Sequence, residues 1–154
     1  MEEFFYTLSY CLMPNHFHLL VKIKPDADLV NLKKNFGILL SSYTKAINKA
    51  NSRTGNLFQQ HSKSKELIED KNLLNVINYI HQNPLRRQLV NKIEDWEFSS
   101  YRDYAGLRTG TLVNKEFLYR FISTNEKFKF FSLTKAEKFD FIFNLEATPK
   151  VDSK

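Results

Sequence analysis

The hydrophobic pattern of the chain alternates at first and then changes to a helical period. Residues 4–13 and 16–24 predict two β-strands, and Pro14-Asn15 between them predicts the turn of an antiparallel pair. From Asp28 apolar positions recur every three or four residues through about Asn51, which predicts a long helix with Asp28 as its N-cap. The chain therefore opens with a predicted hairpin and a helix.

The pattern beyond residue 51 is more broken. Residues 52–56 interrupt the helix, and residues 57–68 predict a short strand. A second helix should begin near Asp70, and Pro84 should end or kink it at Asn83. The tail contains two predicted helices whose phenylalanines we expect to pack in a core, with a protein interface as the alternative: Phe117, Phe121, Phe128, Phe130, Phe131, Phe139, Phe141 and Phe143.

Length and composition limit the class of protein. A chain of 154 residues is expected to form one hydrophobic core. An acidic start at Glu2 and Glu3 argues against a signal peptide, and no apolar run approaches the ~20 residues of a membrane span. The lone Cys11 excludes an internal disulfide and a multi-cysteine zinc site, and we interpret it as a small buried hydrophobe. We expect a cytoplasmic protein without a membrane partner.

The net charge of +6 is concentrated in one part of the chain. Residues 31–92 carry eleven Lys and Arg against three acidic residues, a net +8, whereas residues 1–30 sum to −2 and residues 93–154 to zero. Such an excess favours a phosphate-rich partner, although a solvated lysine-rich helix face would look the same.

Two histidines suggest a metal site. His16 and His18 are two residues apart in a predicted strand, so their side chains project from the same face. Two neutral imidazoles placed in this way can share one divalent ion. A pair of polar side chains on a half-solvated sheet face is the alternative.

The second helix carries another candidate pair. Tyr79 and Asn83 are four residues apart and therefore lie one turn from each other on one helix face, where they could serve one site. The alternative makes Tyr79 an amphipathic boundary residue and Asn83 a polar group at the end of a helix.

Three blocks of sequence together resemble one family: residues 13–21 (MPNHFHLLV), 78–87 (NYIHQNPLRR) and 96–101 (WEFSSY). They are similar, in content and order, to the single-tyrosine HUH transposases, and most similar to the branch associated with repetitive extragenic palindromes. The resemblance covers about residues 6–106. We therefore predict an HUH transposase-like domain at 1–106 and a helical, Phe-rich C-terminal extension at 107–154.

The resemblance implies an α+β fold of the ferredoxin-like HUH nuclease type, an antiparallel sheet flanked by helices. It implies that His16 and His18 bind a divalent metal, Mg or Mn, and that Tyr79 is the nucleophile. The third ligand of the family matches Asn83, while Gln82 is an alternative that lies off the face of Tyr79. The implied reaction is cleavage and rejoining of single-stranded DNA through a 5′-phosphotyrosine.

Single-stranded or hairpin DNA is thus the expected partner. Candidate DNA contacts are the basic residues Lys33, Lys34, Lys63, Lys65, Arg86 and Arg87. The family usually has a strand and a helix ahead of the histidine strand, so we expect a sheet that lacks them. This predicts a short natural form, a decayed element, or a homodimer that completes the sheet by strand exchange.

Two rival functions belong to other classes. One is a catalytically inactive transposase remnant that binds nucleic acid through its basic face. The other, less favoured, is a zinc-binding regulator that uses His16, His18 and His61.

Overall fold

The computed structural model describes residues 1–58, 64, 66–67 and 72–136. Its sheet consists of β1 (Phe5–Leu12) and β2 (Phe17–Ile23), which pair antiparallel as the alternating pattern predicted. Tyr6 lies opposite Lys22 and Cys11 lies opposite His18, with a register shift between Thr7 and Ser9.

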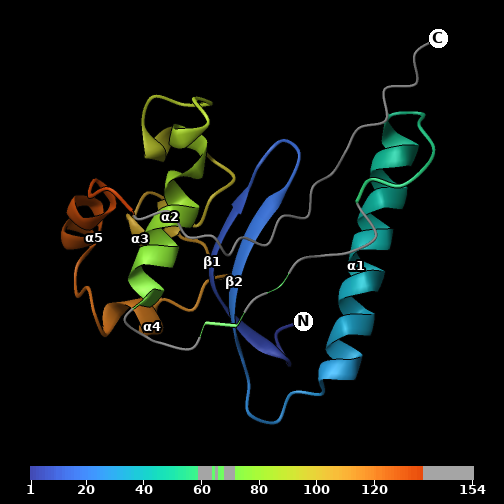
Figure 1. The fold of residues 1–154 in the computed structure, drawn as a ribbon, viewed down its shortest axis with the longest axis horizontal. Coiled ribbons are helices and arrows are strands. Elements are labelled where there is room, and N and C mark those ends of the chain that lie inside the picture. The colour runs from blue at the N-terminus through green and yellow to red at the C-terminus, as the bar shows by residue number, and fades with distance from the viewer. Residues whose placement is uncertain (59–63, 65, 68–71, 137–154) are drawn as a thin grey trace.

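Five helices and one short 3-10 turn complete the described part of the chain. They are α1 (Leu29–Ala50), α2 (Leu73–Arg86), the 3-10 turn η2 (Ile93–Asp95), α3 (Tyr101–Tyr104), α4 (Glu116–Tyr119) and α5 (Asn125–Ser132). Figure 1 shows the hairpin between α1 on one side and α2, α3 and α5 on the other. The molecule is thus an α+β fold, as expected.

The alternation of β2 decides which side chains meet which helix. Phe17 packs against Phe36 of α1, with ring centroids 6.3 Å apart. The next residue, His18, points to the opposite face and lies 6.3 Å from the ring of Tyr79 in α2. One strand therefore presents its odd positions to α1 and its even positions to α2.

Helix α1 starts where the sequence predicted. The Asp28 carboxylate accepts hydrogen bonds from the backbone N–H groups of Val30 and Asn31, at 2.9 and 3.1 Å. None of the residues of α1 is buried, however, and Leu39 and Tyr43 on its apolar stripe remain half exposed. The helical period was predicted correctly, but in the described part of the chain this stripe is only partly covered.

Helix α2 lies at the centre of the core and has nine buried residues. Its Ile77 packs in one cluster with Leu8 of β1, Tyr104 of α3 and Phe128 of α5. Residues on both sides of position 106 thus share a core, while the domain boundary itself stays a prediction.

The phenylalanines of the tail have different environments. Phe128 is buried, and Phe117 and Phe131 pack partly against the core, as expected. Phe121, just beyond the end of α4, and Phe130 of α5 are exposed, which corrects the prediction that they pack in the core. Phe130 is exposed because α5 buries the opposite face, which carries Phe128. Phe139, Phe141 and Phe143 lie outside the described residues.

The outer edge of β1 is covered by segments from later in the chain. Ser99 forms a bridge with Cys11, Val113 forms one with Thr7, and the Leu12 N–H donates to the carbonyl of Phe98 at 2.8 Å. The third block of the family resemblance therefore extends the sheet at the strand that precedes the histidines.

Two predictions of secondary structure need correction. Pro84 does not end α2, which continues to Arg86, whereas a kink at Asn83 stays a prediction; proline removes only one helical hydrogen bond, and the Pro84 side chain is fully buried. A strand was predicted at residues 57–68, but those of its residues that the structure describes are not in strand conformation. The other residues of this segment lie outside the described part of the chain, and so does the predicted helix start at Asp70. In the described ranges no helix is both long and apolar enough to span a membrane.

Candidate functional site

The two histidines converge at the start of β2. Their Nε2 atoms lie 3.1 Å apart, and the rings meet edge to face with centroids 4.8 Å apart. The Nδ1 atom of His16 is 2.7 Å from the side-chain oxygen of Asn15 in the turn. The hairpin therefore brings both Nε2 atoms to one point, as the spacing of the histidines predicted.

Burial keeps His18 neutral. The side chain is 2 % exposed, and its desolvation, together with the positive charges of His16 and Arg87, lowers the pKa of His18 from 6.5 to about 3. A neutral imidazole has a lone pair available for a metal ion at physiological pH.

The donor set fits a shared divalent ion. At bond lengths of about 2.0–2.2 Å, two imidazole nitrogens on one ion lie about 3–3.5 Å apart, which matches the observed 3.1 Å. Within the described residues no group of three His, Cys, Asp or Glu could hold a metal ion, and the amide of Asn83 is the third ligand that the family resemblance implies.

Tyr79 reaches the same place from α2. Its ring stands edge to face on His18, and the guanidinium of Arg86 lies 4.9 Å from its centroid. The phenol is half buried between a histidine of the pair and a cation. The packing of α2 on the sheet thus joins two motifs that are about 60 residues apart.

The two amides after Tyr79 point in different directions. Asn83 is buried, and its side-chain nitrogen donates to the Tyr79 carbonyl at 2.9 Å, which holds it one turn from the phenol. Gln82 instead donates to the carbonyls of Ser132 and Thr134, just beyond or at the end of α5. Gln82 connects α2 to the C-terminal segment.

Sequence reasoning missed a buried hydrogen-bond network beneath the site. His81 Nε2 lies 3.0 Å from Ser9 Oγ and 2.8 Å from Ser100 Oγ, and all three residues are fully buried. The network joins α2, β1 and the residue before α3. A histidine inside the block that also contains Tyr79 and Asn83 was the available signal.

The candidate DNA contacts are distributed over the molecule. Arg86 and Arg87 are exposed at the end of α2, beside Tyr79 and near His18. Lys33 and Lys34 are exposed on α1, on the other side of the sheet. Lys63, Lys65 and His61 lie outside the described residues.

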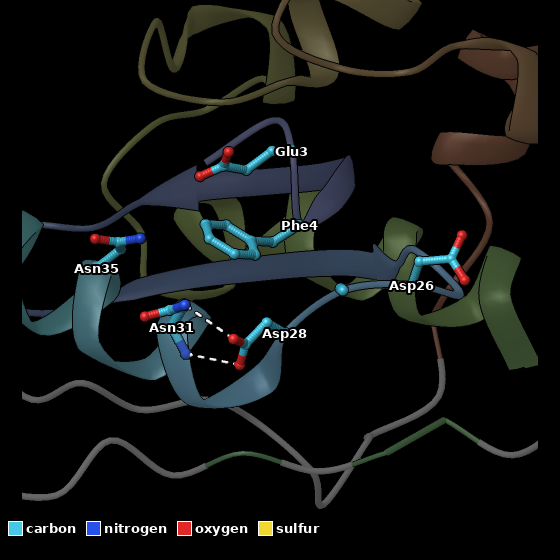
Figure 2. A pocket seen from close by; sticks show the side chains of 7 residues that line it. Glu3, Phe4, Asp26, Asp28, Asn31 and Asn35 are labelled. Atoms are coloured by element: carbon cyan, nitrogen blue, oxygen red, sulfur yellow. Dashed lines mark hydrogen bonds between the residues drawn. The ribbon is translucent and has the colours of Figure 1, made fainter.

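A pocket of about 470 Å³ lies at the start of α1, away from the histidine pair. Figure 2 shows the residues that line this pocket, among which the Asp28 carboxylate accepts a hydrogen bond from the side-chain amide of Asn31. Glu3 and Asp26 add two further carboxylates, and no Lys or Arg lines the pocket. Such a lining repels phosphate, so this pocket is not where DNA would be cleaved.

The α+β fold, in which a histidine pair faces a helical tyrosine, is consistent with the HUH transposase fold. The chain belongs to the family described as "Transposase IS200 like", whose family model matches residues 2–83. This range contains His16, His18, Tyr79 and Asn83.

A curated relative supports the same assignment. The chain is 29% identical over 104 residues to a "Putative REP-associated tyrosine transposase" of Haemophilus influenzae. The match covers 63% of this chain and 59% of the relative, so the chain spans about three-fifths of that protein's length. No solved structure matches the chain.

Proposed function

We propose that this protein is a metal-dependent transposase and endonuclease that cleaves and rejoins single-stranded DNA through a 5′-phosphotyrosine intermediate. The observation that carries the proposal is the approach of Tyr79 to the His16–His18 pair, with ring centroids 6.3 Å apart between Tyr79 and His18. Membership of the IS200-like transposase family supports the reaction class.

In this proposal His16, His18 and Asn83 hold a magnesium or manganese ion. When bound, such an ion polarises the scissile phosphate and neutralises charge that develops on it. The family resemblance assigns Asn83 as the third ligand, and the hydrogen bond from Asn83 to the Tyr79 carbonyl holds the amide one helical turn from the nucleophile.

Tyr79 supplies the nucleophile. Its phenol oxygen attacks the phosphorus, and the bond from phosphorus to the 3′-oxygen breaks, which leaves a 5′-phosphotyrosine and a free 3′-hydroxyl. Attack by a second 3′-hydroxyl on the phosphotyrosine reverses the step and rejoins strands without ATP. Arg86, stacked against the Tyr79 ring, and Arg87 would bind the DNA backbone beside the reacting phosphate.

The test is formation of a covalent protein–DNA band with labelled, hairpin-bearing single strands and Mg²⁺ or Mn²⁺. Tyr79→Phe should abolish the band and leave DNA affinity within about twofold, because only the phenol oxygen is lost. Tyr43→Phe, which changes an exposed tyrosine of α1, is the matched control and should form the adduct normally.

Two results would contradict the proposal. An adduct in Tyr79→Phe would place the chemistry on another tyrosine. Binding without any adduct in the wild-type protein would instead support the nucleic-acid-binding remnant.

A further inference from the structure

Five residues near the other end of the hairpin form a surface that the function proposed above does not use. Tyr6 of β1 and Phe117 of α4 lie with ring centroids 6.1 Å apart. Three cations lie over these rings: Lys22 is 4.3 Å and Arg120 5.0 Å from the centroid of Phe117, and Lys24 is 4.7 Å from that of Tyr6. We call Tyr6, Phe117, Lys22, Lys24 and Arg120 the aromatic–basic patch.

The patch is accessible to a ligand. Tyr6 is 39% exposed, Lys22 and Arg120 are exposed, and Phe117 is partly buried against the core. The contact of Phe117 with the core holds the ring in place, and the cations of the patch lie over the rings. Fixed rings with cations beside them match the two parts of a nucleotide, a flat base and a charged phosphate.

The patch lies on the same face of the sheet as the candidate site. Lys22 is four residues after His18 in β2, so both side chains project toward the side of α2. Tyr6 is the cross-strand partner of Lys22 and shares this face. Four residues of strand span about 14 Å, a distance that a few nucleotides of extended single strand can bridge.

We infer that the aromatic–basic patch binds single-stranded DNA and holds the strand that flanks the phosphate attacked by Tyr79. Bases stack on Tyr6 and Phe117 after the cations move aside to pair with phosphates. The inference rests on the proposed function for the position of the cleaved phosphate, but binding at the patch can be measured without cleavage.

The experiment measures the affinity of the Tyr79→Phe protein for a fluorescein-labelled oligothymidylate of about 15 nucleotides by fluorescence anisotropy. Tyr6→Leu with Phe117→Leu keeps apolar bulk but removes both rings, and should weaken binding at least about tenfold. Lys22→Glu should also weaken binding and should reduce the slope of log affinity against log salt by about 0.7.

Two control variants separate the patch from general effects. Lys129→Glu makes the same change in net charge on an exposed position of α5, and Phe130→Leu removes an aromatic ring that is 75% exposed. Both should bind within about twofold of the parent. Circular dichroism melting of each variant identifies any that fails to fold, and in that case Lys24→Glu and Arg120→Glu, at exposed or half-exposed positions, test the same patch.

The outcomes distinguish this inference from the proposed function. Folded patch variants that bind like the parent, or controls that lose as much affinity, would overturn the inference even if the wild-type protein forms the adduct. A loss of affinity that is confined to the patch variants supports the inference, whether or not the wild-type protein forms the adduct. If the wild-type protein forms no adduct, only the nuclease proposal is removed.

Discussion

At the scale of single residues, the observation that favours a metal site is the 3.1 Å distance between the Nε2 atoms of His16 and His18. Replacing His16 and His18 together by Ala should reduce affinity for Mn²⁺ at least about tenfold and abolish adduct formation, because one amide cannot fix an ion alone. Isothermal titration calorimetry measures the first effect and the gel assay the second. Tyr79→Phe serves as the control and should keep its metal affinity. Unchanged Mn²⁺ affinity in the double variant would remove the metal site.

A second residue-scale prediction concerns His81. Complete burial lowers the pKa of His81 from 6.5 to about 3, so the folded protein keeps it neutral while the unfolded chain takes up a proton below pH 6.5. Between those two values the unfolded state binds more protons, and the free energy of unfolding should fall by up to about 1.4 kcal/mol per pH unit as pH falls. The stabilisation that neutral His81 gives the folded state is fully present above pH 6.5 and is lost as the pH falls below that value.

Urea unfolding between pH 7 and pH 4.5 measures this effect. His81→Gln places an amide within reach of Ser9 and Ser100 and does not titrate, so its stability should depend less steeply on pH than that of the wild-type protein. Equal pH dependence in both proteins would show that other groups carry the acid sensitivity.

At the scale of elements, α1 and α2 differ in how the fold holds them. Helix α2 has nine buried residues and α1 has none, so α1 depends more on its own capping. Asp28→Ala removes three hydrogen bonds at the N-terminus of α1, two from backbone N–H groups and one from the Asn31 side chain, and should destabilise that helix by about 1 kcal/mol. Hydrogen exchange should show lower protection in α1 and little change in α2.

The control for this prediction is Asp26→Ala, which removes an exposed carboxylate two residues before the cap. Protection of α1 should remain as in the wild-type protein. A uniform loss of protection in both helices after Asp28→Ala would mean that α1 and α2 unfold as one unit.

At the scale of the whole molecule, the distribution of charge predicts how the protein responds to salt. Residues 31–92 carry a net charge of +8, and we expect their basic side chains to make four to six contacts with phosphates. For single-stranded DNA this number of contacts predicts a slope of log affinity against log salt of about −3 to −4. Reversing Arg86 and Arg87 to Glu should flatten this slope and reduce cleavage, whereas reversing Lys127 and Lys129 on α5 should change both little. Equal affinity for a blunt duplex would contradict a single-strand transposase.

Several features of this protein are local and were therefore readable in the sequence. The two-residue spacing of His16 and His18 at the start of β2 brings their rings together, and Asp28 caps the helix that its own neighbours form. Tyr79 and Asn83 lie one turn apart because helical spacing requires it. These results depend on a few adjacent residues and on backbone geometry, which is the same in any fold.

Other features depended on how the elements pack. The meeting of Tyr79 with His18, the bonding of His81 to Ser9, and the approach of Phe117 to Tyr6 join segments between about 60 and more than 100 residues apart. The local hydrophobic pattern predicts which face of α2 is apolar, but it does not predict where along β1 and β2 that face packs. That position follows from complementary burial over the whole core, and it brings the tyrosine, the histidines and the flanking patch to one face of the sheet.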